Sequence, residues 1–559
     1  MGSATLASCA GEQFVEVKGT VTPDFITPPE PTLGAGEFAD TVLFNGDLIT
    51  MDKNIPSAKA IAVKGDKILI VGRDAEVKAL AGESTQMIDL KGKTITPGLI
   101  DAHNHMQVWG TLMNNFIPLL PPEVTSLDKM LVKIKEAVAQ ANPGEWVQFY
   151  YWMIDPLPTI KELDPISPDN PLWLMHQAGH LGIANSAALK IAGITVDTEA
   201  PEGSVIERDA NGELTGAFYN HKAMDLVRIY MPEVDTGNIL NNIALAETLM
   251  SAEGVTSFHD CNARFSALQA YMQAGREHAM TLRGQVFYTL EWPADLERAL
   301  NEMQAYTDDY MRFAGYKFLI DGQLPTFYTH EPHAGVRWDM PTWEPKLFKE
   351  TIRQLHDTGL QISVHCGGDA AVDLTLEAYE EAMNANPRPD PRHRIEHAVI
   401  TKPHATEKAA DLGVHISCQP QFIRLYTRAA EIIGEERLER IKVTREWLDA
   451  GINLALGSDV PTTPWHEPQI TLKAAVTRLA LDNEPFFPEQ AMTIEEALYA
   501  HTMGSAKAAF DENIKGSLTP GKLADLVVWD ENYYTIKPKY ISEVKALTTM
   551  VGGKIVHQA

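Results

Sequence analysis

The chain has 559 residues, of which 45% are hydrophobic and 22% charged, the composition of an ordinary globular protein long enough for a large core. Its formal net charge is −28 and no stretch concentrates basic residues, so nucleic acid is not an expected partner and the acidity indicates solubility. The four cysteines are too scattered for a disulfide framework or a zinc knuckle, and no apolar run reaches the ~18 residues of a membrane span.

Residues 1–38 predict an N-terminal arm. Residues 18–38 are rich in Pro, Gly and Thr, which is typical of a linker. The tetrapeptide ending at Cys9 (LASC) resembles a bacterial lipobox, but the basic and long apolar regions of a signal peptide are missing before it. Two interpretations stay open: a trimmed lipoprotein signal with a lipid anchor at Cys9 and a periplasmic location, or the unstructured start of a cytoplasmic protein.

Strand patterns crowd at both ends of the chain. Asn45-Gly46 and Gly65-Asp66 each stand between apolar runs and predict hairpin turns, and Gly552-Gly553 does the same near the C-terminus. We therefore expect residues 39–97 and 514–559 to form one composite β-sandwich domain.

Between these ends, short apolar runs alternate with helical patterns such as Leu374–Met383 and Ile494–Ala509. This alternation is typical of βαβ units around a parallel sheet. It predicts an α/β fold in which residues 98–513 form a TIM-like (β/α)8 barrel. Residues of about 115–235 are rich in Pro, Trp and turn signals and break the alternation, so we expect an insertion beside the site.

Polar residues close the predicted barrel strands, at the face where such barrels place their catalytic groups. His103 and His105 are two positions apart, a spacing that points both imidazoles to the same side of a strand. The other members of this series, each at its own strand end, are Lys317, His365, His397 and Asp459. Four imidazoles and a carboxylate suit Zn²⁺ or a similar ion.

Each residue of the series also has an ordinary structural explanation. A histidine pair of this spacing arises by chance in a chain with 18 histidines, and Asp459 before Val-Pro could cap a helix. Lys317 stands in the apolar run "GYKFLI" and could form a buried ion pair with Asp321 or Asp459. Chance placement of all six on successive strands is improbable.

This series of strand-end residues and the segments around it resemble the amidohydrolase superfamily. Within it they resemble the YtcJ-like and N-substituted formamide deformylase-like branch, amidohydrolase family 3. The segments that carry the resemblance are "TITPGLIDAHNH", "GHLGIANSAAL", "GYKFLIDG", "HCGGDAAVD", "RIEHA", "LALGSDVP" and "GSLTPGKLADLVVWD". They cover nearly the whole chain from residue 39 onward.

The resemblance implies a metal centre and a hydrolytic mechanism. The implied ligands are His103, His105, Lys317, His365, His397 and Asp459, holding one or two Zn²⁺ ions or other divalent metals. Desolvation favours the neutral amine of a buried lysine, which can add CO₂, and the resemblance implies such a carboxylated Lys317 between two metals. Asp459 is implied as the general base, His180 as a contact to the substrate carbonyl, and Asn185 and Asp369 as further substrate contacts.

The expected function is hydrolysis of a non-peptide C–N bond, of amide or N-formyl type, in a small molecule by metal-activated water. Two alternatives stay open: a deaminase acting on a ring or imine carbon, and a barrel that binds ligands without catalysis. The sequence leaves open whether the protein forms a homodimer, which substrate it uses and which metal it holds.

Overall fold

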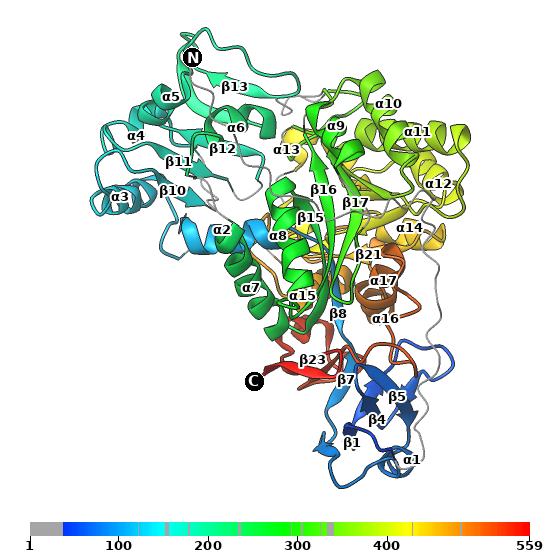
Figure 1. Cartoon of the computed structure of the whole chain (residues 1–559). Helices are drawn as coiled ribbons and strands as arrows, with labels where there is room; N and C mark the ends of the chain where they lie inside the picture. The colour runs from blue at the N-terminus through cyan, green and yellow to red at the C-terminus, as the bar shows by residue number, and fades with distance from the viewer. Residues whose placement is uncertain are drawn as a thin grey trace, which may run out of the picture.

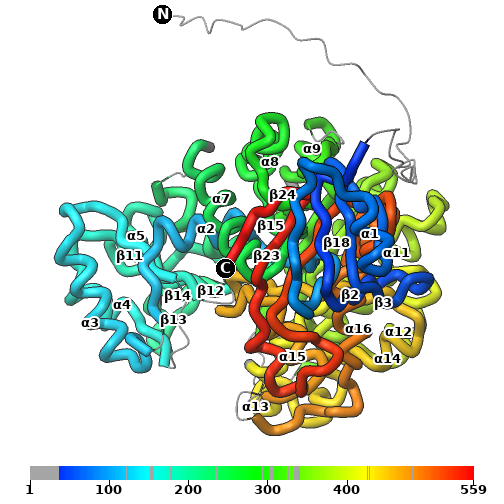
Figure 2. Tube along the Cα trace, turned by 90° about the horizontal axis from the view of Figure 1, so that it is seen from below, coloured from blue at the N-terminus to red at the C-terminus, as the bar shows by residue number. Residues whose placement is uncertain are grey.

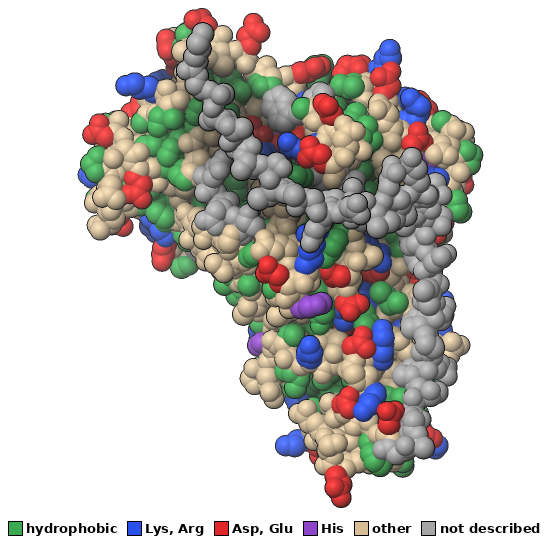
Figure 3. Space-filling model, in the orientation of Figure 1, with side chains coloured by type: hydrophobic (Ala, Val, Ile, Leu, Met, Phe, Trp, Pro, Cys, Tyr) green, Lys and Arg blue, Asp and Glu red, His purple; other side chains and the backbone are tan. Residues whose placement is uncertain are grey.

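The computed structural model describes residues 37–120, 122–150, 156–176, 179–232, 236–291, 293–302, 306–324, 326–332, 340–426, 429–480 and 483–559. The expected arm and Cys9 lie outside these residues. No helix in the described ranges is long and apolar enough to cross a membrane. Acidic and basic side chains are interspersed over the face shown in Figure 3, which carries no broad basic area.

An eight-stranded parallel sheet forms the centre of the molecule and confirms the expected barrel (Figure 1). In spatial order its strands are β8 (Leu99–Asn104), β15 (Val255–Ala263), β16 (Arg283–Leu290), β17 (Met311–Leu319), β18 (Gln361–Cys366), β19 (Arg394–His397), β20 (His415–Cys418) and β21 (Leu454–Leu456). Beyond β21, the Asp459 N–H donates to the His103 carbonyl at 2.7 Å and so links the last strand to the first. The strands are almost fully buried on both faces, which explains why their sequences are largely continuous apolar runs.

Helices cover the outside of the barrel. They include α7 (Thr236–Ala252), α8 (Phe265–Arg276), α10 (Pro345–His356), α11 (Asp369–Ala385), α12 (Pro403–Asp411), α14 (Thr444–Asp449) and α15 (Pro468–Thr477). The predicted helix at 374–383 is confirmed within α11. The predicted helix at 494–509 is also confirmed, as α16 (Ile494–Tyr499) and α17 (Ser505–Ala508) joined by a π-turn over 500–504.

Two small sheets lie below the barrel, toward the viewer in Figure 2, and strands from both ends of the chain pair in the second of them. One contains β1 (Thr41–Phe44), β4 (Ala60–Lys64), β5 (Lys67–Gly72) and β6 (Gln86–Asp89). The other contains β2 (Asp47–Ile49), β3 (Ser57–Ala58), β7 (Thr94–Pro97), β22 (Leu526–Trp529), β23 (Ala546–Val551) and β24 (Lys554–Gln558). Side chains from both ends share one apolar core, including Leu43, Ile95, Leu526 and Met550, and confirm the composite sandwich.

The three predicted turns have different outcomes. Gly65-Asp66 joins the antiparallel pair β4–β5 and Gly552-Gly553 joins β23–β24, so both hairpins are confirmed. The hairpin at Asn45-Gly46 is wrong, because β1 and β2 belong to different sheets. The Asn45-Gly46 dipeptide does lie between two strands, but these strands do not pair with each other. β1 pairs with β6 and β2 pairs with β7, which are more distant in the sequence.

The segment between α2 (Met106–Asn115) and α7 folds beside the barrel around a sheet of its own (Figure 1). Its strands are β9 (Ile117–Pro118), β10 (Val147–Tyr150), β11 (Leu172–Met175), β12 (Leu181–Ala184), β13 (Val205–Arg208) and β14 (Leu214–Tyr219). The helices α3 (Leu127–Val138), α4 (Ile160–Leu163), α5 (Ser186–Ala192) and α6 (His221–Arg228) pack on it. This six-stranded sheet is not evident in the sequence, because its strands are short and turn residues separate them.

A buried histidine pair lies far from the strand ends that carry the predicted site residues. The Ile362 N–H donates to His393 Nδ1 at 3.1 Å, so His393 donates through Nε2 to Nδ1 of His356 at 2.8 Å. His356 in turn donates to the carbonyl of Asn386 at 2.8 Å. Both rings are neutral in this chain of hydrogen bonds. Burial, reinforced by His356, lowers the pKa of His393 well below its ordinary 6.5.

Replacing His393 with glutamine should make stability less dependent on pH in acid. As pH falls below 6.5, the unfolded chain takes up a proton at this position that the folded chain resists, so the wild type loses stability. Between pH 6 and pH 4 we expect its free energy of unfolding to fall by up to about 1.4 kcal/mol per pH unit more steeply than that of the variant. Urea denaturation at several pH values measures both slopes. Parallel slopes would contradict the expectation.

Candidate active site

A cavity of about 550 Å³ opens at the carboxyl ends of the barrel strands, between the barrel and the segment around β9–β14. The sequence-predicted residues that line it are His103, His105, His180, Lys317, His365, His397 and Asp459. Their placement follows from the parallel sheet, which brings all eight strand ends to one face.

His103 and His105 both contact Asp459. His103 is the fifth residue of β8, and His105 follows the strand and begins α2 as its N-cap residue. Nε2 of His105 lies 2.9 Å from Oδ1 of Asp459, and Nε2 of His103 lies 3.4 Å from the same oxygen. Asp459 has a left-handed backbone (φ 56°), which turns its buried carboxylate toward the two rings.

The residues at this point fit a metal ion. His103 donates through Nδ1 to Glu396, so Nε2 is the nitrogen that can offer a lone pair, and that buried atom has no hydrogen-bond partner. It faces a carboxylate oxygen at 3.4 Å, an arrangement that a cation between the two atoms, a proton or a metal ion, stabilises. His103, His397 and Asp459 each offer a ligand atom, and these atoms lie within 4.8 Å of one another. Imidazole nitrogens with a carboxylate oxygen are a donor set for zinc.

Lys317 lies on β17 and is 2% exposed. It borders the cavity, and its strand neighbours in register are Thr289 and Ser363. Within the described ranges its ammonium makes no hydrogen bond or ion pair, so the buried pair with Asp321 or Asp459 that the sequence left open does not form.

His365 and His397 lie side by side, with ring centroids 4.4 Å apart. His397 donates through Nδ1 to Oε1 of Gln419 at 2.7 Å, and Lys442 donates to the His397 carbonyl at 2.7 Å. His365 donates through Nε2 to the carbonyl of Gly322 at 3.0 Å, which leaves its lone pair on Nδ1.

Electrostatics divide the site residues by charge. Burial lowers the pKa of His103, but Cys261, Glu396 and Asp459 outweigh burial and raise that pKa well above 6.5. Burial opposes ionisation of Asp459, but His103 and His105 outweigh burial and hold its pKa well below the ordinary range. Burial, assisted by Lys317, lowers the pKa of His365 to about 3. Burial, with His221 and His365 nearby, lowers the pKa of His180 well below 6.5. His180 and His365 are thus neutral, and a metal ion would take the place of the proton that His103 shares with the neighbouring carboxylates.

Two of the predicted substrate contacts lie away from the cavity lining. The Asn185 side chain caps α5 by accepting from Ala188 N and also bonds Leu172 N and the Ser167 carbonyl, so it is saturated by structural contacts. Asp369 begins α11 and pairs with Lys402 at 2.9 Å. Both belong to segments that resemble the family, but neither lines the cavity.

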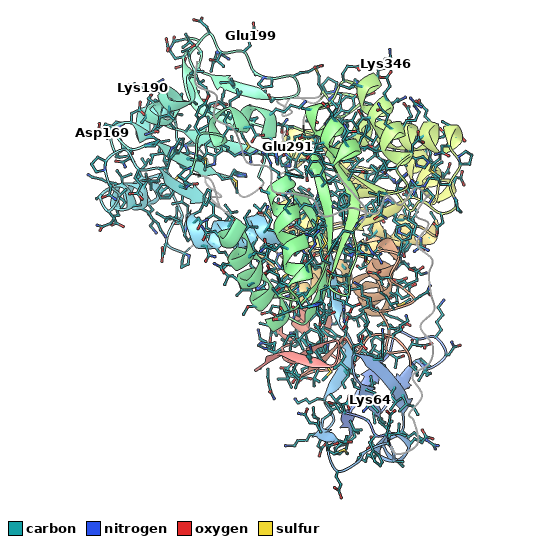
Figure 4. The ribbon with its side chains drawn as sticks, in the orientation of Figure 1. Lys64, Asp169, Lys190, Glu199, Glu291 and Lys346 are labelled. Atoms are coloured by element: carbon teal, nitrogen blue, oxygen red, sulfur yellow. The ribbon has the colours of Figure 1, made fainter. Side chains whose placement is uncertain are left out.

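Several residues at the site were not predicted from the sequence. Glu396 lies inside the quoted segment "RIEHA", yet only its histidine was assigned a role. His221 and Glu291 line the cavity next to His180, and His221 Nδ1 lies 2.7 Å from Glu291 Oε1. Figure 4 shows Glu291 where the barrel faces the segment around β9–β14. The one sequence feature that could have indicated Glu291 is its position directly after β16, where the other strands carry their predicted site residues.

Part of the cavity lining is apolar. Leu112 and Phe116 come from α2 and the residue after it, Trp173 and Met175 from β11, and Ile239 from α7. The lining also contains charged side chains besides the predicted ligands, among them Asp225, Arg228 and Arg264, and a mixed lining of this kind suits small organic molecules.

The barrel, the cavity and the metal-fitting donor set define a metal-dependent hydrolase of the amidohydrolase superfamily. Residues 86–557 match the sequence model of the Amidohydrolase family, and the chain belongs to that family.

Relatives align over nearly the whole chain. It is 31% identical to "Protein LONG AFTER FAR-RED 3" of Arabidopsis thaliana over 551 residues, 95% of this chain and 92% of that protein. It is 28% identical to the "N-substituted formamide deformylase" of Arthrobacter pascens, over 93% of this chain and 99% of that protein. The fold is similar to that of an uncharacterized metal-dependent hydrolase from Pyrococcus horikoshii, with a TM-score of 0.73 at 22% identity, covering 89% and 99% of the two chains. The resemblance identified from the sequence motifs is thereby confirmed.

Proposed function

We propose that this metal-dependent amidohydrolase hydrolyses an amide or N-formyl bond of a small molecule that is not a peptide. The observation that carries the proposal is the contact of the Asp459 carboxylate with both His103 and His105 in the lining of the cavity. The similarity to a formamide deformylase over nearly the full chain supports the type of bond.

The residues proposed to hold one or two Zn²⁺ ions are His103, His105, His365, His397, Asp459 and a carboxylated Lys317. The ion, when bound, supplies a water of lowered pKa and polarises the substrate carbonyl. Asp459 accepts the proton of the attacking water and delivers it to the leaving nitrogen, a role that suits a carboxylate held ionised by its neighbours. His180 borders the same cavity and donates a hydrogen bond to the substrate carbonyl oxygen.

The shape of the cavity sets the orientation of the substrate. The scissile carbonyl lies near Asp459 and His180, and the organic substituent lies against Phe116 and Trp173. A volume of about 550 Å³ accommodates a small organic molecule but not a folded peptide segment.

The test is product analysis with the zinc-loaded protein. We expect N-formyl or N-acyl amines with an apolar substituent to give an amine and a carboxylate, and His103→Ala to remove bound metal and activity together. His278→Ala, on the exposed turn after α8, is the matched control and should change neither. Ammonia released from an aminated ring compound would overturn the amide assignment. Activity unchanged in His103→Ala would overturn the metal-site assignment.

A further inference from the structure

Behind His103, on the side away from the cavity, lies a buried cluster of charged and polar groups that the proposed chemistry does not use. Its members are Glu396 and Arg394 on β19 and Ser363 on β18. All three side chains are 0% exposed. We propose that Glu396 is a positioning residue that fixes the ring of His103 for metal binding, with Arg394 and Ser363 fixing Glu396 in turn. The inference rests on the proposed use of His103 as a ligand.

The hydrogen bonds leave Glu396 no freedom to rotate. Oε1 accepts from Arg394 Nε at 2.7 Å and from Ser363 Oγ at 2.7 Å. Oε2 accepts from Arg394 Nη2 at 3.0 Å and from His103 Nδ1 at 2.5 Å. The guanidinium therefore binds both carboxylate oxygens, and the remaining bond of Oε2 points to the imidazole.

Arg394 is itself fixed on its other side. Its Nη2 donates to the carbonyl of Ala102 at 2.7 Å, and its Nη1 donates to Nδ1 of His259 at 3.0 Å. The guanidinium also lies 5.1 Å from the centroid of the Phe287 ring. Ala102 precedes His103 on β8, so the same arginine holds the backbone of the predicted ligand and the carboxylate that contacts its ring.

This arrangement sets which nitrogen of His103 faces the cavity. Because Glu396 can only accept from His103, the imidazole carries a proton at Nδ1, and Nε2 is the nitrogen that can offer a lone pair to a metal ion. Nε2 is the buried nitrogen without a partner, 3.4 Å from Asp459. A carboxylate on the outer nitrogen of a ligating histidine fixes both its tautomer and its ring orientation.

A structural purpose alone explains the cluster poorly. Burying an ion pair costs desolvation of both charges, and well-packed apolar residues of similar volume are usually as stabilising or more so. The neighbouring Phe287, Ile395 and Cys366 are apolar and fully buried or nearly so. The Glu396–Arg394 ion pair lies among these apolar residues, and Glu396 contacts Nδ1 of His103. Its presence there is explained if it orients the His103 ring for metal binding.

The experiment measures metal affinity rather than catalysis. Glu396→Gln keeps the volume but removes the charge, and Glu396→Asp keeps the charge beside Arg394 but withdraws the oxygen from His103. We expect the Zn²⁺ dissociation constant, from competition with a chromophoric chelator, to rise about 10–100-fold in both variants. The matched control is Glu247→Gln, a 1% exposed glutamate on α7 that bonds Thr281 and Leu282. It should lower the melting temperature of the metal-free protein without weakening zinc binding.

The outcomes separate this inference from the proposed function. If His103→Ala weakens zinc binding but both Glu396 variants, folded by circular dichroism, bind zinc within about twofold of wild type, only the positioning role fails. Cobalt-loaded protein provides a second readout, because His103, Cys261 and Glu396 also offer ligand atoms within 4.8 Å of one another. A thiolate-to-cobalt absorption band abolished by Cys261→Ser would overturn the inference, since Glu396 would then belong to the ligand group itself.

Discussion

Asp459→Asn should lower kcat by about 10²–10⁴-fold, the range for removal of a general base from a preorganised site. The asparagine keeps the size of the side chain and the acceptor oxygen near His105, but it cannot take a proton from the attacking water. The carboxylate is also the anion shared by His103 and His105 at 3.4 and 2.9 Å, so zinc affinity should fall as well. Steady-state kinetics at saturating zinc separate the loss of the base from the loss of metal.

The matched control for this substitution is Asp308→Asn. Asp308 accepts from the backbone N–H groups of Tyr310 and Met311 at the start of β17, the end of the barrel opposite the cavity. It should cost stability and leave kcat near the wild-type value. If Asp459→Asn retained more than about a tenth of wild-type kcat at saturating zinc, another group would have to be the base.

Lys317→Ala should lower kcat/KM by about 100-fold or more, at the upper end of what loss of a supporting group costs a metal site. The side chain is 2% exposed on β17 and its amine has no partner in the described part of the chain, and the proposed carbamate would give it metal ions as partners. Zinc per protein should fall in the variant, and millimolar formate or acetate should restore part of the activity by supplying the missing carboxylate.

Lys317→Arg provides the sharper comparison, because arginine keeps a positive charge at the position but does not form a carbamate. It should lose activity as alanine does, without rescue by carboxylates. An unmodified lysine in a metal-loaded crystal grown with bicarbonate would contradict the carbamate. The family assignment would be unaffected, since it rests on the whole sequence match.

The sequence alone was sufficient for the barrel and for seven of the residues that border its cavity, His103, His105, His180, Lys317, His365, His397 and Asp459. Parallel strands bring every carboxyl end to one face, so His103, Lys317, His365 and Asp459 converge although more than 350 residues of chain separate the first from the last. The residue types then limit the chemistry to that of a metal site.

What the sequence left undetermined depends on contacts between segments distant in the chain. Nothing around Asn185 indicated that four buried polar groups of its own segment would saturate its side chain. The strands β9–β14 were missed because each is at most six residues long and turn residues interrupt the period. Glu396 stood in a recognised motif, but only the fold shows that it meets His103, which lies 293 positions earlier.

The antiparallel pairing of β7 with β22 has a consequence for how the protein is made. Pro97 meets Leu526, so β7 leaves the ribosome long before its partner exists. At 5–20 residues per second, synthesis of the intervening chain takes on the order of 20–90 s. During that time the N-terminal strands present an unpaired edge, which is a site for association with other nascent chains. The enzyme's yield in a cell should therefore depend on translation speed and on chaperones that shield this edge, even though the finished active site lies at the other end of the barrel.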